Sequence, residues 1–168
     1  TRNALKYGAN VPFNRPANLS DDNATNIDVV LHAIEKFNSD IFILLQPTSP
    51  LRTSKHIDDA LCQMMEQGFT KLVSVVEMAK SPFKSFVLDK HGCLQALFDE
   101  EMTNQRRQDI PLVYAANGAI YIFCLSDFNE KNAFPSNGSY PYVMNEKNSL
   151  DIDTKEDLLL LESLINTK

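Results

Sequence analysis

An unbroken apolar run, Ile41 to Leu45, most constrains what this chain can fold into. A run of this length without a polar interruption is typical of a strand buried on both faces, as in a parallel sheet. It leads into the segment Gln46 to Arg52, whose two prolines make it a stiff loop. A buried strand that ends in a rigid loop predicts a sheet flanked by helices.

Helix-like and strand-like segments alternate around this run. The spacing of apolar residues predicts a helix over 24–37 before it, and a helix over 54–67, capped by Ser54, after it. Residues 71–76 form the next buried strand. The inward face of the second helix is expected to carry Ile57, Leu61, Met64 and Met65. The alternation favours an α/β fold with a parallel sheet.

The middle of the chain departs from this alternation. Two short strand-like pieces, 83–88 and 93–97, predict a hairpin inserted between core elements. Residues 99–108 are polar, as in a loop or short helix, and 112–123 is strand-rich but broken by Ala116-Asn117-Gly118. We therefore expect one domain over residues 1–168 with an inserted region at about 80–110.

The two ends of the chain also carry local signals. They predict a helix that Gly8 ends, a short strand over 11–13, a loop over 134–142, an edge strand over 142–144, and a helix over 155–165 capped by Thr154 with Asp157.

Composition excludes some classes of protein. The net charge of −6 excludes a basic footprint for nucleic acid. No apolar run approaches the ~20 residues of a membrane helix, and no signal peptide opens the sequence, so a soluble cytoplasmic protein is expected. The cysteines and histidines show no metal or triad spacing and are interpreted as ordinary structural or surface residues. They are Cys62, Cys93, Cys124, His32, His56 and His91.

The loop Gln46 to Arg52 is the first candidate binding segment, because ligands of open α/β sheets sit beyond the carboxyl ends of strands. Gln46 offers a paired donor and acceptor to a base or sugar edge, and Ser49 offers a hydroxyl. Arg52 could bind a carboxylate or phosphate through two hydrogen bonds. The alternative is a well-capped turn before the helix, with Arg52 at the surface.

Asp151-Ile152-Asp153 is the candidate metal site. Alternation places both carboxylates on one face of an extended segment. Mg²⁺ favours such oxygen donors when it also holds substrate phosphates, and it would neutralise a triphosphate and activate the attacking oxygen. The alternative is that Asp153 and Thr154 cap the last helix.

Scattered cations and one amide complete the candidates. An acidic sugar would need some of the cations, but each could equally be a solvated surface charge. Asn117 could hydrogen-bond a sugar hydroxyl, although Asn117-Gly118 could also be a simple bulge. The cations are Lys84, Arg106, Arg107 and Arg15.

Six stretches, taken together, carry a resemblance to a known family. In chain order they are 15–19 (RPANL), 45–52 (LQPTSPLR), 81–84 (SPFK), 107–108 (RQ), 117–121 (NGAIY) and 151–158 (DIDTKEDL). With this order and spacing, nearly the whole chain resembles the CMP-sialic acid synthetases, or acylneuraminate cytidylyltransferases.

The resemblance implies a Rossmann-like nucleotidyltransferase fold, and a homodimer in which the region 80–110 reaches over the partner's active site. It implies that the anomeric hydroxyl of a nine-carbon acidic sugar attacks the α-phosphate of CTP and releases pyrophosphate. The residues that match the family's motifs are then assigned as follows: Asp151 and Asp153 to Mg²⁺, Gln46 to the sugar, Lys84 and Arg107 to its carboxylate or the phosphates, Asn117 and Tyr121 to the pocket, and Arg15 to the nucleotide side.

The sequence departs from the family pattern in two places. The family opens with a strand and a basic, glycine-rich loop around the CTP phosphates, and nothing like them occurs here. We therefore expect no CTP turnover by these 168 residues alone. The family often carries an arginine just before the NGAIY string, where this chain has Tyr114-Ala115-Ala116. This change suggests a pseudaminic- or legionaminic-type sugar.

Two other hypotheses stay open at this point. One is a non-catalytic module, derived from the enzyme, that binds an acidic sugar or mediates dimerisation. The other is a nucleotidyltransferase of similar fold acting on a deoxysugar acid or a sugar phosphate. The pairing of QPTSPLR with NGAIY favours the sialic acid-type enzyme over the latter.

Overall fold

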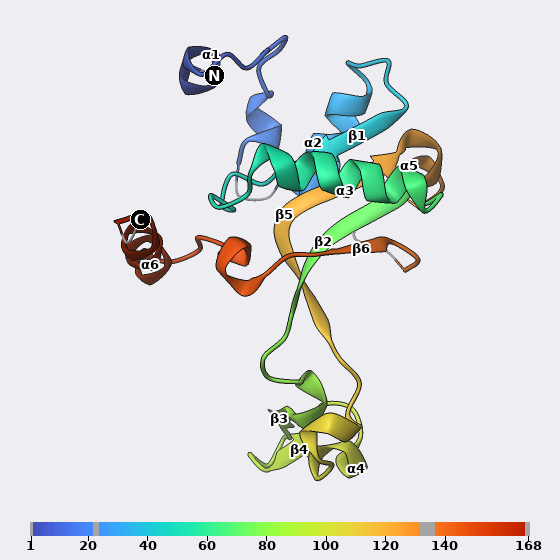
Figure 1. Ribbon diagram of the computed structural model, residues 1–168, viewed down its shortest axis with the longest axis vertical. Coiled ribbons are helices and arrows are strands. Elements are labelled where there is room, and N and C mark those ends of the chain that lie inside the picture. Colours follow the sequence, from blue (N-terminus) through green and yellow to red (C-terminus); the bar gives the residue numbers. More distant parts are fainter. Residues whose placement is uncertain (1, 22–23, 132–136, 167–168) are drawn as a thin grey trace. The chain divides into compact units, whose positions relative to one another are not determined.

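The computed structural model describes residues 2–21, 24–131 and 137–166 (Figure 1). The chain divides into two compact units, each described by itself below. The smaller unit comprises Thr1–Phe42 with Cys124–Phe134, and the larger unit comprises Ile43–Phe123 with Pro135–Lys168. No helix within the described ranges is both long enough and apolar enough to cross a membrane.

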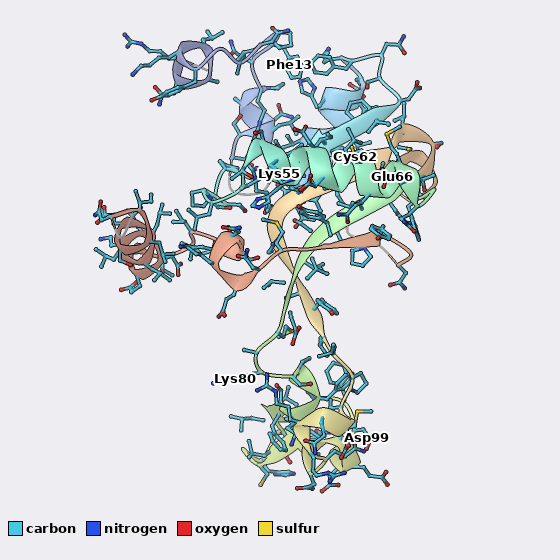
Figure 2. All side chains as sticks on the ribbon, viewed as in Figure 1. Phe13, Lys55, Cys62, Glu66, Lys80 and Asp99 are labelled. Carbon is cyan, nitrogen blue, oxygen red and sulfur yellow. The ribbon has the colours of Figure 1, made fainter. Side chains whose placement is uncertain are left out.

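The described part of the smaller unit contains four short helices. They are α1 (Arg2–Lys6), η1 (Ala17–Leu19), α2 (Asn26–Ile34) and α5 (Leu125–Lys131). Helix α2 is shorter than the expected 24–37 and begins at a capping box formed by Thr25 and Asp28. The predicted strand over 11–13 is wrong: Phe13 packs edge-on against His32 at 5.2 Å instead of pairing in a sheet (Figure 2).

Four of the described strands form a sheet in the order β1-β5-β2-β6. The strands are β1 (Ile41–Leu44), β5 (Tyr114–Cys124), β2 (Lys71–Glu77) and β6 (Tyr140–Val143). The expected α/β class is confirmed, but the sheet is mixed rather than parallel, because β5 runs antiparallel to β2 while β6 runs parallel to it. Burial of β1 on both faces was predicted wrongly: β1 lies at the sheet edge and Ile43 is 38% exposed.

Helix α3 (Ser54–Glu66) packs on the central strand β2 and closes the core of the larger unit. Ala60 and Met64 are buried there, together with Ile120 and Ile122 of β5. Met65, expected on the inward face, is 62% exposed, because successive helical residues point about 100° apart and Met64 occupies that face. The predicted cap, Ser54, is wrong: the N-cap is Thr53, and Ser54 is the first residue of the helix.

Strand β5 is continuous through the position where a break was predicted. Val73 of β2 pairs with Tyr121, and Val75 pairs with Ala116, so residues 117–120 bulge opposite Ser74 alone. Gly118 sits in this bulge with φ +74°, a conformation that side chains rarely adopt. The bulge turns the backbone of a core strand toward the loops at one end of the sheet.

The predicted inserted hairpin is present. Strands β3 (Phe86–Leu88) and β4 (Leu94–Ala96) pair antiparallel. We call residues 80–110 the inserted arm; Lys80 and Asp99 mark it in Figure 2. It also contains η2 (Pro82–Lys84), α4 (Glu100–Thr103) and η3 (Arg107–Asp109). Its exposed apolar side chains are Phe86, Val87, Leu88, Leu94, Leu97 and Phe98.

The C-terminal part returns to the sheet before its last helix. The predicted edge strand is β6, and it occupies the sheet edge as expected. The predicted loop over 134–142 lies partly outside the described residues. After η4 (Glu146–Ser149), helix α6 (Lys155–Asn166) begins at Thr154, whose hydroxyl accepts the Asp157 backbone N–H at 3.2 Å, as predicted.

Candidate active site

Gly118 marks the point where three segments of the larger unit meet. A Cβ atom at this position would collide with Oε1 of Gln46. It would also lie 3.4 Å from Oδ2 of Asp151 and 3.5 Å from Oγ of Ser49. We call Gln46, Ser49, Gly118 and Asp151 the Gly118 corner. A glycine is required there because the surrounding polar side chains approach the backbone itself.

Arg52 fixes the loop that carries Gln46 and Ser49. Its guanidinium donates to the carbonyl oxygen of Gln46 at 3.0 Å and to that of Ala119 in β5 at 2.7 Å. Partial burial lowers the pKa of Arg52 from its ordinary value, yet the group remains a cation. The side chain therefore joins both ends of its own loop to the bulge. Contact between Arg52 and a substrate stays a prediction.

Asp151 is held beside the same loop by a backbone hydrogen bond. The N–H of Ile152 donates to the carbonyl of Thr48 at 2.9 Å. Oδ1 of Asp151 is buried and finds no hydrogen-bond partner among the described residues. Since a buried carboxylate oxygen is costly to leave unpaired, this atom points to a cation or donor supplied by a ligand.

Asp153 differs from Asp151 in its surroundings. Its side chain is exposed, and its backbone N–H donates to Oδ2 of Asp157 at 3.1 Å. The joint binding of a metal ion by Asp151 and Asp153 stays a prediction. Within the described residues, no group of three or more His, Cys, Asp or Glu side chains could hold a metal ion together. Any ion here would need further ligands from a substrate or water.

A buried hydrogen-bond network supports the corner from below. Oγ of Ser74 donates to Oδ1 of Asn117 at 2.6 Å and accepts the N–H of Ile120 at 2.7 Å. The Asn117 amide also donates to Oγ of Ser149 at 2.9 Å. These bonds satisfy polar groups within the bulge, and they lock the positions of Gly118 and of the segment that leads to Asp151.

Tyr121 lies close enough to Asp151 for their charges to interact. Burial raises the pKa of the Tyr121 phenol, and the negative charge of Asp151 raises it further. The phenol is therefore kept protonated next to the unpaired carboxylate.

A cavity of about 480 Å³ opens beside Asp151 and is lined by residues of η4 and α6 as well. This volume suits a small-molecule ligand.

The predicted cations do not gather at the corner. Lys84 donates to the backbone carbonyl of Gln105 within the inserted arm, and Arg106 pairs with Asp109 at 2.7 Å. Arg107 lines a different cavity of about 470 Å³, together with the ends of β2 and β6. Arg15 belongs to the smaller unit, where it donates to the carbonyl of Leu19 at 3.4 Å.

Two residues of the site were missed in the sequence. Ser149 lies in a short polar stretch, where a serine carries no local signal. Ser74 interrupts the otherwise apolar strand Leu72 to Val76. That interruption is a usable signal, because a serine in a buried strand needs a partner.

The chain is similar in sequence to known proteins. The chain is 32% identical over 156 residues to N-acylneuraminate cytidylyltransferase of Streptococcus agalactiae serotype V, covering 92% of the chain and 37% of that protein. It is 31% identical over 174 residues to the CMP-N,N'-diacetyllegionaminic acid synthase of Legionella pneumophila, covering 96% of the chain and 72% of that protein. No family model matches the chain.

The fold has a counterpart among solved structures. The structure of CMP:2-keto-3-deoxy-manno-octonic acid synthetase complexed with CTP matches with a TM-score of 0.64 at 13% identity. The match covers 99% of this chain and 76% of that one, and it supports the nucleotidyltransferase fold. The sequence similarity to the Legionella protein shows that the chain belongs to the CMP-sialic acid synthetase family, the acylneuraminate cytidylyltransferases.

Proposed function

We propose that the protein transfers CMP from CTP to the anomeric hydroxyl of a nine-carbon, sialic acid-type sugar. The hydroxyl oxygen forms a bond to the α-phosphorus, the bond from the α-phosphorus to the oxygen that bridges it to the β-phosphorus breaks, pyrophosphate leaves with that electron pair, and the hydroxyl proton passes to water. The observation that carries this proposal is the buried, unpaired Oδ1 of Asp151 beside Gln46 in a member of this family.

Asp151 and Asp153 would hold a magnesium ion. The unpaired oxygen of Asp151 fits this role, because Mg²⁺ usually binds one or two carboxylates and takes its remaining ligands from water and substrate phosphates. When bound, the ion supplies charge neutralisation to the triphosphate. Tyr121, kept protonated by burial and by Asp151, would donate a hydrogen bond rather than accept one.

Gln46 would bind the sugar through its carboxamide. The backbone carbonyl of Gln46 is held by Arg52, and its side chain lies against Gly118. The side-chain carboxamide is therefore already oriented before a ligand arrives. Asn117 would act mainly through Ser74 and Ser149, because its carboxamide oxygen and one N–H are already engaged. Ser49, buried at 2% exposure, contacts the Asn117 carbonyl at 3.5 Å and would shape the same pocket.

The inserted arm would form the dimer interface and present Lys84 and Arg107 to the partner's site. Its exposed apolar side chains, with Leu88 and Leu94 each 69% exposed, support this assignment, because an exposed apolar patch marks an interaction surface. The double variant Leu88→Lys with Leu94→Lys should sediment as a monomer where the wild-type protein sediments as a dimer. Its melting temperature should stay within a few degrees of that of the wild-type protein. An unchanged sedimentation coefficient would contradict the assignment.

Pyrophosphate release by the whole protein that carries these residues, measured with CTP and a panel of nonulosonic acids, tests the function, whereas the 168 residues alone are expected to release none. We expect release that requires both CTP and the acidic sugar, with a legionaminic- or pseudaminic-type sugar preferred over N-acetylneuraminate. A clear preference for N-acetylneuraminate would overturn the assignment of the sugar but keep the reaction. Calorimetric binding of the sugar without any pyrophosphate release under all conditions would instead favour a non-catalytic binding module.

A further inference from the structure

His56 lies at the start of α3, next to Lys55, which is labelled on this helix in Figure 2. Nδ1 of the His56 ring accepts the backbone N–H of Thr53 at 3.3 Å, and the backbone N–H of His56 donates to Oγ1 of Thr53 at 3.3 Å. Thr53 directly follows Arg52, the last residue of the Gln46–Arg52 loop. The imidazole is therefore fixed to one end of that loop.

The other ring nitrogen faces a different part of the site. Nε2 of His56 lies 3.4 Å from the carboxamide nitrogen, Nδ2, of Asn148 in η4. Because Nδ1 accepts a hydrogen bond, the neutral ring carries its proton on Nε2 and must donate there. The carboxamide then presents its oxygen to the ring, which a half turn of the Asn148 amide provides. The ring of Tyr142, at 6.5 Å between centroids, packs on the same imidazole.

This contact acts on the segment that carries Asp151. The N–H of Met144 donates to the carbonyl of Val75 at 2.8 Å, and the N–H of Ile152 donates to that of Thr48 at 2.9 Å. Between these backbone anchors, residues 145–151 contain η4 and Asp151. Side chains hold this stretch at Ser149, which binds Asn117, and at Asn148, which faces His56.

We propose that His56 is a positioning residue that holds the Asp151 segment at a fixed distance from the Gln46–Arg52 loop. This inference rests on the proposed function, since its kinetic consequence concerns CMP transfer. His56 touches neither reacting group; it connects the helix that follows one binding loop to the short helix that precedes the metal-binding carboxylate.

The alternative role is helix capping alone, and His56→Asp separates the two. Aspartate at the third position of a helix completes the capping box of α2, between Thr25 and Asp28, so it restores the bond to Thr53 while its shorter side chain ends before Asn148. We expect His56→Asp to keep the melting temperature while kcat falls roughly tenfold and the KM for CTP changes less than about threefold, as for a misplaced group. A wild-type kcat in His56→Asp would reduce His56 to a cap.

A double-mutant cycle isolates the contact. Asn148→Ala should reproduce the loss of kcat seen in His56→Ala, and the double variant should be no slower than either single variant. Independent, multiplicative losses would overturn the proposal. Asp28→Ala is the matched control, because Asp28 occupies the same capping position in α2. It should lower the melting temperature without changing kcat.

An NMR measurement tests the contact between His56 and Asn148 independently of enzymatic activity. Nitrogen NMR of the imidazole should show His56 as the Nε2–H tautomer, with that proton protected from exchange and released in Asn148→Ala. Absence of pyrophosphate release by the wild-type protein would defeat the proposed function and leave this spectrum to decide the contact. The Nδ1–H tautomer, or no response to Asn148→Ala, would defeat the inference itself.

Discussion

Under the Gly118 corner, polar side chains are buried and hydrogen-bonded to one another, whereas in the inserted arm apolar side chains are exposed to solvent. Ser74 is 0% exposed and Asn117 5%, and both are hydrogen-bonded. In the arm, Leu88 is 69% exposed and Phe98 60%. Among the described residues, Oδ1 of Asp151 is the buried side-chain polar atom without a hydrogen-bond partner, whereas the arm exposes several large apolar side chains. A substitution at the corner or in the network under it should therefore reduce kcat or the free energy of unfolding far more than the equivalent substitution in the arm.

The largest difference should come from Asp151→Asn. The amide removes the charge that the proposed metal ion needs, so we expect kcat to fall roughly 100- to 1000-fold. Stability without metal should not fall, because the change removes a buried, unpaired carboxylate oxygen. Initial rates and thermal melts measure both effects.

Asp99→Asn in the arm is the matched control for that change. Oδ1 of Asp99 accepts the N–H of Glu101 at 2.9 Å as a helix cap, and asparagine keeps this bond. Its rates and melting temperature should stay close to wild type. Equal losses from the two variants would contradict the special position of Asp151.

The next largest difference should come from a pair of glycines in the same backbone conformation. Gly118 and Gly92 have φ of +74° and +80°, but an added Cβ meets Gln46 at the former and nothing within 4 Å at the latter. Gly92→Ala should cost about 1 kcal/mol from backbone strain, and Gly118→Ala should cost roughly 2–4 kcal/mol because crowding adds to it. Urea denaturation of both variants tests this, and equal costs would show that Gln46 moves aside freely.

A smaller contrast is expected between two serines. Ser74→Ala leaves the Ile120 N–H and the Asn117 carboxamide oxygen without their buried hydroxyl partner, and should lower the free energy of unfolding by roughly 1–3 kcal/mol. Ser81 accepts the N–H of Phe83 in the arm at 3.3 Å, and Ser81→Ala should cost less than about 1 kcal/mol. A cost for Ser81→Ala as large as that for Ser74→Ala would remove the distinction between the regions.

The smallest effect is electrostatic and confined to the corner. Because burial and the charge of Asp151 both raise the pKa of Tyr121, Asp151→Asn should lower that pKa while leaving it above its ordinary value. Carbon NMR of the tyrosine ring during an alkaline titration follows this directly. Asp153→Asn is the control, and a larger shift from it than from Asp151→Asn would place the interacting charge elsewhere.

Local sequence patterns predicted what local forces determine. The proline-bounded loop, the hairpin of the arm and the Thr154–Asp157 cap are confirmed, because each depends on residues close in the chain. The pairing of β5 with β2 in antiparallel direction was not predicted, since strand direction depends on contacts between residues far apart in sequence.

The candidate site divides in the same way. Gln46, Asp151 and Asn117 were singled out by their motifs, and Gly118 brings the first two together. Ser74 was missed because its partners, Asn117 and Ile120, are more than forty residues away in sequence. His56 was interpreted as an ordinary structural residue, and its contact with Asn148 spans 92 positions. Hydrogen bonds over such separations leave no periodic trace in the chain.

The bulge in β5 also has a consequence for the lifetime of the closed site. The amides of Ala119 and Ile120 donate to the side chains of Asn117 and Ser74, in residues that are fully buried. Their exchange with deuterium requires the central strands to separate, not merely a loop to swing away. A ligand bound at this corner would then leave through motions of the loops alone. The hydrogen-bonded bulge of β5 beneath it would persist for as long as the sheet stays folded.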